Sequence, residues 1–160
     1  MSWLHQRVFP GIIALWAVAV PVTAQSTFDI YWVDVEGGAA TLAVAPDGQS
    51  MLIDTGFPGP DDRDAMRIKA ALDEAGLSRI DHLVITHYHT DHVGGLEALA
   101  EMVPIGHCYD HNTITESENQ RWVDAYLRVC GDKRLVHVPR QRGDTVGFQF
   151  ACRSGKLVVA

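Results

Sequence analysis

The sequence predicts an α/β fold, in which helices cover a β-sheet, and two features of the chain indicate this class. Three short segments rich in β-branched, aromatic and small apolar residues come first after the N-terminal region, separated by glycine-containing turns. After them, segments with helical spacing of apolar residues alternate with short apolar runs. A meander followed by alternating helices and strands is typical of a layered α/β domain.

The first part of the chain predicts three neighbouring strands. FDIYWVDV (28–35) is rich in aromatic and β-branched residues, and a second strand is expected at 41–45. The turn at 46–49 contains a proline, which sets φ, and a glycine, which accepts the left-handed conformation. The third segment, SMLIDTG (50–56), is a short apolar run that ends on Asp54. We expect this strand to be buried on both faces.

The later part predicts helices and strands in alternation. The segment 63–75 predicts a helix, because its apolar residues recur near helical spacing and Gly76 follows them. These apolar positions are Met66, Ala70, Leu72 and Ala75. The remaining expected elements are a strand at 80–87, a helix at 94–104, a strand at 105–110, a helix at 117–131, and strands at 134–139 and 156–160.

The first 24 residues differ in composition from the rest and predict a signal peptide. Arg7 precedes an apolar run, Ile12–Val20, that is too short to span a bilayer. Val22-x-Ala24 provides the small residues of a cleavage site. We therefore expect export to the periplasm or the medium, removal of residues 1–24, and one domain over 25–160. No stable membrane anchor is expected after cleavage.

The charge balance bears on the class of partner. The formal net charge is −7 at pH 7, and no cluster of lysine and arginine is longer than two residues. A nucleic-acid groove is usually basic, so we expect a small-molecule substrate and no nucleic-acid partner. The composition leaves the oligomeric state open.

The chain has three cysteines, Cys108, Cys130 and Cys152. Export makes a disulfide compatible with the sequence, but an odd number leaves one cysteine over. Buried thiols that pack as small apolar groups are an equally good interpretation. The spacings match no zinc-knuckle pattern.

The segment THYHTDHVGG (86–95) carries the strongest indication of function. His87, His89, Asp91 and His92 form the pattern H-x-H-x-D-H directly after an expected strand. Imidazole nitrogens and carboxylate oxygens are the usual zinc ligands outside thiolate sites. Open α/β sheets bind ligands in loops beyond the carboxyl ends of their strands. The two glycines at the end of the segment would let the next helix approach closely.

Other polar residues carry weaker indications. His82, His107 and His137 are single histidines beside apolar residues, and we expect them in the core or on the surface. His111 follows an expected strand end, and Asp144 follows a glycine, but neither lies in a recognisable ligand motif. We rank both well below the 86–95 segment as metal ligands.

THYHTDHVGG resembles the signature of the metallo-β-lactamase superfamily, and LIDTG (52–56) resembles the strand motif that precedes it. The segment 33–56 is also similar to the opening of the hydrolase domain of bacterial DNA-uptake (competence) channel proteins, and the chain resembles exported hydrolases of that group. The resemblance covers about residues 28–147. It implies an αββα sandwich, and it is specific for the fold rather than for a substrate.

The resemblance implies a metal-dependent hydrolase of unknown substrate. His87 and His89 would bind a first metal ion and Asp91 and His92 a second, while Asp54 would orient a ligand histidine. Two Zn²⁺ ions are implied, with Mn²⁺ or Fe²⁺ as alternatives. They would lower the pKa of a shared water and polarise the scissile group. Asp91 would also accept or donate the proton.

The superfamily fold has two similar halves, and its second half supplies a bridging carboxylate and a further histidine. This chain has no matching motif for either, and KLVVA (156–160) reads as an interrupted strand. We therefore expect a C-terminally truncated sequence that represents the N-terminal half, binds metal weakly and hydrolyses little. Two alternatives remain, a phosphodiesterase or nuclease of the DNA-uptake type and a non-catalytic metal-binding relict.

Overall fold

The computed structural model describes residues 27–110 and 119–131. Several predictions lie outside these residues and stay predictions. They are the signal peptide 1–24, the strands 134–139 and 156–160, the weaker ligand candidates His111 and Asp144, and the positions of His137 and Cys152. Within the described ranges, no helix has the length and apolar character needed to cross a membrane.

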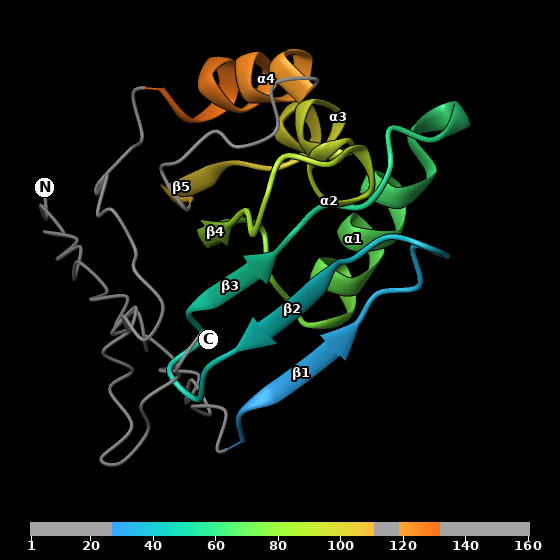
Figure 1. Ribbon diagram of the computed structural model, residues 1–160. Coiled ribbons are helices and arrows are strands. Elements are labelled where there is room, and N and C mark those ends of the chain that lie inside the picture. The colour runs from blue at the N-terminus through green and yellow to red at the C-terminus, as the bar shows by residue number, and fades with distance from the viewer. Residues whose placement is uncertain (1–26, 111–118, 132–160) are drawn as a thin grey trace, which may run out of the picture.

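A five-stranded sheet forms the centre of the described structure, with its strands in the order β1-β2-β3-β4-β5 (Figure 1). The first three strands pair antiparallel, and β3, β4 and β5 pair parallel. The predicted meander and the α/β class are therefore confirmed. The strands are β1 Asp29–Trp32, β2 Thr41–Val44, β3 Ser50–Ile53, β4 Ile80–Val84 and β5 Ile105–Tyr109.

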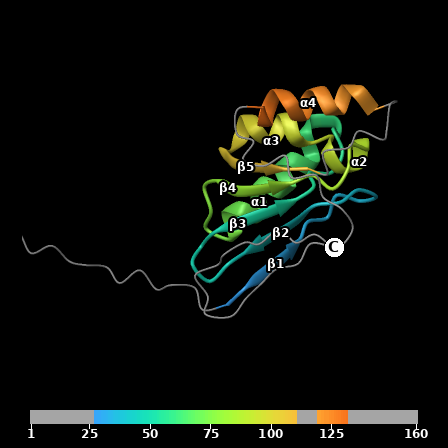
Figure 2. The ribbon, with the colours of Figure 1, turned by 60° about the vertical axis from the view of Figure 1, so that its left-hand side comes forward.

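The helices gather on one side of this sheet, as Figure 2 shows. Parallel neighbours need a crossover connection, and helices supply it between β3 and β4 and between β4 and β5. Their bounds are η1 Pro60–Asp62, α1 Arg63–Glu74, α2 Thr90–Val93, α3 Leu96–Met102 and α4 Gln120–Cys130. The predicted helices are thus present, and α2 is an additional short turn within the motif segment.

The main hydrophobic core lies between the helices and the sheet. Leu42, Leu52 and Leu83 are register partners on neighbouring strands, and all three are fully buried. Ile68 of α1 and Leu96 of α3 belong to the same cluster. Each such side chain stabilises the fold by about 1.5–3 kcal/mol through burial. This layer therefore holds the strand ends in place, and the candidate site is built on those ends.

A smaller cluster lies on the opposite face of the sheet. Ala43, Met51 and Val84 form it, and each is one position away from a residue of the main core. Because side chains alternate along a strand, this places them on the other face. Met51 and Leu52 are both buried, so β3 is covered on both faces, as predicted.

Helix α1 buries only part of the predicted apolar set. Met66 is 57% exposed, whereas Ala65, Ile68 and Leu72 are buried. These three residues follow the i, i+3, i+7 spacing of an amphipathic helix. Of the four predicted apolar positions, Leu72 is buried and Ala75 packs against the core, whereas Met66 and Ala70 are exposed. The sequence alone does not say which of two overlapping apolar stripes meets the sheet.

Cys108 of β5 and Cys130 of α4 form a disulfide. Of the two interpretations that the sequence left open, the bridge is the one observed. It ties the last turn of α4 to the strand at one end of the sheet order.

Candidate functional site

Two chain segments meet at the carboxyl edge of the sheet, where β3 and β4 end side by side. Ile53 and Val84 are partners in the β3–β4 ladder, and the amide of Asp54 donates to the Val84 carbonyl oxygen at 2.9 Å. The predicted strand 80–87 ends at Val84, which leaves His87 in the following loop. The motif residues thus lie on a loop and on α2, at the edge where α/β sheets place ligands.

Asp54 connects these two segments through its side chain. It is 2% exposed, and its φ of 59° is a left-handed conformation that aspartate accepts more readily than most residues. Oδ1 accepts a hydrogen bond from the Thr86 amide at 2.8 Å, and Oδ2 accepts one from the Thr86 hydroxyl at 2.7 Å. His92 Nδ1 lies 2.8 Å from Oδ2. When Nδ1 donates to Asp54, Nε2 is the nitrogen left with a lone pair for a metal.

The three histidines of the motif lie against one another. The ring centroids of His87 and His89 are 4.6 Å apart, and those of His87 and His92 are 3.9 Å apart. Asp91 Oδ2 lies 3.5 Å from His92 Nε2. His89 is exposed, and the other three residues are partly exposed. The structure therefore brings all four predicted ligands together at the surface.

The donor atoms of these four residues suit a divalent cation, but their side chains are not arranged around one common metal position. Imidazole nitrogens and a carboxylate oxygen are the donors that zinc takes in catalytic sites. Across residues 27–110 and 119–131, no three histidine, cysteine, aspartate or glutamate side chains are spaced to hold a metal ion. The side chains would have to turn toward a common point to bind one.

The charge state of His87 suits ligation. Partial burial lowers its pKa below the ordinary 6.5, and the neighbouring His92 and His89 lower it further. The carboxylates of Asp54 and Asp91 act in the opposite direction. A lowered pKa keeps the imidazole neutral at physiological pH, and the neutral form is the one that binds metal.

Backbone hydrogen bonds hold the second half of the motif. The amide of Ala39, between β1 and β2, donates to the Asp91 carbonyl oxygen at 3.0 Å. The amide and the hydroxyl of Thr55 both donate to the His92 carbonyl oxygen, at 2.6 and 3.1 Å. Sequence reasoning missed both contacts, because they join residues that lie far apart in the chain.

The two glycines after the motif allow a close backbone approach, as predicted. A Cβ on Gly95 would lie 2.3 Å from the Thr55 carbonyl oxygen, and one on Gly94 would lie 2.3 Å from Pro58 Cδ. Both distances are shorter than any side chain tolerates, so α2 and the start of α3 pack directly on the segment after β3. Glycine at these positions is therefore required by packing.

Asp64 is a further supporting residue that sequence reasoning missed. It is fully buried at the start of α1, and its Oδ2 accepts a hydrogen bond from the Phe57 amide at 2.8 Å. Arg63 Nε donates to its other oxygen at 2.8 Å. Asp64 thereby fixes the segment that follows Asp54. A buried aspartate on a helix has no distinguishing pattern in the sequence, so nothing in the sequence marked it.

Two known proteins are similar to this chain. An atrochrysone carboxyl ACP thioesterase from Cryptosporiopsis sp. is 32% identical over 116 residues, which are 69% of this chain and 34% of the thioesterase. A hydroxyacylglutathione hydrolase from Alkalilimnicola ehrlichii is 40% identical over 101 residues, which are 61% of this chain and 38% of that hydrolase. The chain thus spans little more than a third of the length of either relative.

The family comparison covers most of the described structure. The sequence profile of the metallo-beta-lactamase superfamily matches residues 33–150, which include all the motif residues and most of the sheet. The resemblance to DNA-uptake channel proteins and the interpretation of the chain as an N-terminal half stay predictions. With a match over more than half of its length, the chain belongs to the metallo-beta-lactamase superfamily.

Proposed function

We propose that this protein is a metal-dependent hydrolase that activates water at a two-metal site of histidine and aspartate ligands. One observation carries the proposal. The motif histidines lie with ring centroids 3.9 and 4.6 Å apart at the carboxyl edge of the sheet, and a buried carboxylate orients one of them. Membership of a superfamily with hydrolase-named relatives supports the same conclusion.

The proposed ligand assignment follows the order of the motif. His87 and His89 bind the first ion, and Asp91 and His92 bind the second. Zn²⁺ is the proposed metal, because imidazole and carboxylate donors suit it, and Mn²⁺ or Fe²⁺ are alternatives. Further ligands would complete each site, since four side chains shared between two ions leave both below the usual ligand number.

The residues of this chain have three roles in the proposed mechanism. Asp54 holds the His92 ring through Nδ1, which leaves Nε2 as the nitrogen that would bind a metal. Asp91 keeps a carboxylate oxygen within 3.5 Å of His92 Nε2, and this carboxylate accepts the proton that water loses. The bound metal pair would supply Lewis acidity, which lowers the pKa of water and polarises the scissile carbonyl.

Among the substrate classes open to this superfamily, an acyl thioester is the one we propose to test first. The two similar proteins are named as an acyl carrier protein thioesterase and a hydrolase of hydroxyacylglutathione. A lactam, a lactone and a phosphodiester are the competing classes. The net charge of −7 favours none of the anionic polymers that a nuclease would bind.

We also propose that the protein acts in the periplasm or outside the cell, on a small molecule. The predicted signal peptide supports export. The Cys108–Cys130 disulfide supports it independently, since disulfides persist in oxidising compartments.

The test is hydrolysis by the exported chain after its metal has been removed and replaced. The chain is treated with EDTA, reloaded with Zn²⁺ or Mn²⁺, and assayed on a thioester, a lactone, a nitrocefin-type lactam and bis-nitrophenyl phosphate. We expect slow thioester hydrolysis that depends on added metal and is lost in Asp91→Asn. Turnover of the phosphodiester alone would support the nuclease alternative. Metal binding without turnover of any substrate would support a non-catalytic metal-binding role, and turnover insensitive to EDTA would overturn the proposal.

A further inference from the structure

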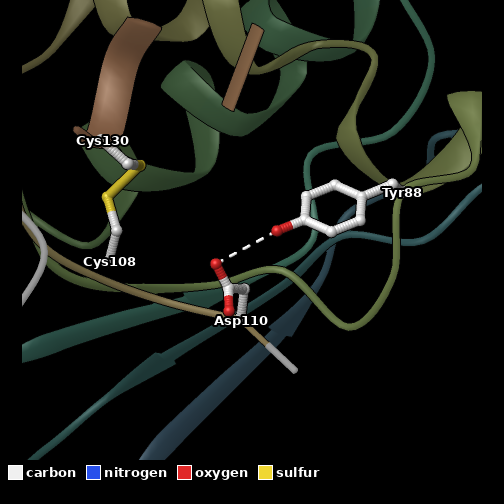
Figure 3. Close-up of a disulfide and its surroundings, with 4 residues drawn as sticks. All are labelled: Tyr88, Cys108, Asp110 and Cys130. Atoms are coloured by element: carbon white, nitrogen blue, oxygen red, sulfur yellow. Dashed lines mark hydrogen bonds between the residues drawn. A yellow bond between two sulfur atoms is a disulfide. The ribbon is translucent and has the colours of Figure 1, made fainter. Parts of the chain in front are cut away.

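Tyr88 lies between two of the proposed ligands, His87 and His89, but its side chain is directed into the protein. It is 3% exposed, while His89 is exposed. Its hydroxyl donates a hydrogen bond to Asp110 Oδ2 at 3.1 Å, across the space between the motif loop and the end of β5 (Figure 3). Because Tyr88 joins the two histidines, fixing its ring restricts the backbone of both.

A second contact holds the same ring from the helix layer. Tyr126 of α4 packs edge-on against Tyr88, with ring centroids 5.7 Å apart and an interplanar angle of 68°. Tyr126 is 1% exposed, so this contact is part of the core. Aromatic pairs in this geometry stabilise more than the buried area alone accounts for. Tyr88 is therefore supported by the end of β5 on one side and by α4 on the other.

The disulfide joins these two supports. Cys108 lies two residues before Asp110, and Cys130 lies one helical turn after Tyr126. Figure 3 shows the bridge beside the Tyr88–Asp110 hydrogen bond. The Cys108–Cys130 bond thus fixes the distance between β5 and α4 close to the place where both contact Tyr88.

The other half of the motif is held differently. Asp91 and His92 receive backbone hydrogen bonds from Ala39 and Thr55, and Asp54 holds the His92 ring. None of these residues belongs to β5 or α4. Asp54 also reaches His87, because it accepts from the Thr86 hydroxyl, which lies 3.1 Å from His87 Nδ1. The support that includes the disulfide reaches His87 and His89 from the other direction, through Tyr88.

We propose that Tyr88 is a positioning residue for His87 and His89, and that the Cys108–Cys130 disulfide sets their metal affinity through it. The inference rests on the proposed metal-binding function and adds redox control of it. A dithiol reductant would give two electrons and two protons to the bridge. The S–S bond breaks, two cysteine thiols form, and the dithiol closes to a disulfide. With β5 and α4 no longer bonded, Tyr88 is held less tightly and metal affinity falls.

The first experiment measures Zn²⁺ affinity by calorimetry for the full chain and for Tyr88→Phe, with Tyr31→Phe as the matched control. Phenylalanine keeps the ring against Tyr126 and removes the hydroxyl. We expect a roughly tenfold loss of affinity in Tyr88→Phe, at the low end of what outer-shell partners contribute, and none in Tyr31→Phe. Asp110→Asn, which keeps an acceptor oxygen, should retain more affinity than Asp110→Ala.

The second experiment tests the disulfide in a Cys152→Ser background. Cys108→Ser/Cys130→Ser removes the bridge without creating thiols that could bind zinc themselves. We expect a loss of Zn²⁺ affinity similar to that of Tyr88→Phe, and no further loss when the two changes are combined. The visible absorption of bound Co²⁺ should change in both variants, whereas a purely structural role would lower only the melting temperature.

The outcomes separate the two proposals. Zn²⁺ binding by the wild-type chain that is unaltered in Tyr88→Phe would overturn the inference and leave the proposed function standing. Absence of Zn²⁺ binding by the wild-type chain would overturn both. If the serine variant does not fold, Tyr88→Phe and the Asp110 pair decide the matter with the disulfide intact.

Discussion

The described structure contains two groups of neighbouring histidines, and only one of them has the surroundings of a metal site. The loop histidines, His87, His89 and His92, follow β4 at the carboxyl edge of the sheet. The strand histidines, His82 and His107, are register partners within β4 and β5. Their ring centroids are 5.4 Å apart, not far from the 4.6 and 3.9 Å of the loop group. Closeness of imidazoles is therefore common to both.

The groups differ in how carboxylates contact their imidazoles. Asp54 Oδ2 lies 2.8 Å from His92 Nδ1, and Asp91 Oδ2 lies 3.5 Å from His92 Nε2. In the strand group, His82 Nδ1 meets the hydroxyl of Tyr109 at 3.2 Å. Asp81 lies near enough to raise the pKa of His82, but its carboxylate oxygens bind Ser50 and Arg79. A carboxylate bonded to a ligand orients it and also offsets the charge of a cation, whereas a neutral phenol supplies no charge.

Lowered basicity does not distinguish the two groups. Burial is the main cause of a lowered pKa in both His82 and His87, and a neighbouring histidine adds to it in each case. What marks the loop group is its place at the strand ends together with its carboxylates. A cluster of imidazoles therefore becomes a candidate metal site through its position in the fold.

The largest expected difference between the two groups is in metal binding. His89→Ala should reduce Zn²⁺ affinity roughly 100-fold or more, since it removes a proposed ligand outright. His107→Ala, the matched change in the strand group, should leave the affinity unaltered. Calorimetric titration of both variants measures this. Equal losses in the two would remove the distinction between the groups.

Loss of the supporting carboxylate should have a smaller effect than loss of a ligand. Asp54→Asn is expected to weaken Zn²⁺ binding by about 10- to 100-fold, because His92 loses the carboxylate that orients its ring. Asp73→Asn, on the exposed face of α1, is the control. Competition with a zinc indicator gives both constants. An Asp54→Asn protein that binds as tightly as Asp73→Asn would show that His92 needs no such support.

The close contact between Gly95 and the Thr55 backbone should affect the free energy of unfolding. Gly95→Ala places a methyl group 2.3 Å from the Thr55 carbonyl oxygen and should lower the free energy of unfolding by about 1–3 kcal/mol. Gly37→Ala, whose added Cβ meets only Phe57 Cε2 at 3.9 Å, should change it much less. Urea unfolding of the two variants measures the difference. A Gly95→Ala protein no less stable than Gly37→Ala would mean that the loop relaxes freely.

The smallest expected effect concerns pH and applies to both groups. The pKa values of His82 and His87 are lowered from 6.5 in the folded protein, so the unfolded chain binds more protons below that pH. Stability should therefore fall as the pH decreases from about 6.5 toward the lower folded values. His82→Gln should lessen this dependence, as measured by urea unfolding at neutral and at mildly acidic pH. An acid dependence that is unaltered in His82→Gln would assign it to the loop group alone.

Much of the fold was predictable because its determinants are local. The turns, the short apolar strands and the end of α1 at a glycine depend on residues that are adjacent in the sequence. Each was predicted near its observed place. The buried face of α1 was predicted only in part, because Met66 and Ala65 are both compatible with a helical stripe. Only the position of the sheet selects Ala65.

The site shows the same division. The spacing of the H-x-H-x-D-H residues predicted their meeting, and the resemblance to a known family suggested the place of Asp54. The contacts of Thr55, Asp64 and Tyr88 were not predictable. Each depends on a partner brought near by folding, such as Asp110, which is 22 positions from Tyr88. These are common residue types, and no pattern in the neighbouring sequence indicates that they make such contacts.

The response of the histidine rings to metal tests the proposed metal site most directly. Zn²⁺ is titrated into the chain labelled with ¹⁵N, and the side-chain nitrogens of all the histidines are followed by NMR. We expect the resonances of His87, His89 and His92 to shift until the added metal saturates them, while those of His82 and His107 do not move. Shifts in the strand histidines, or none in the loop histidines, would contradict this expectation.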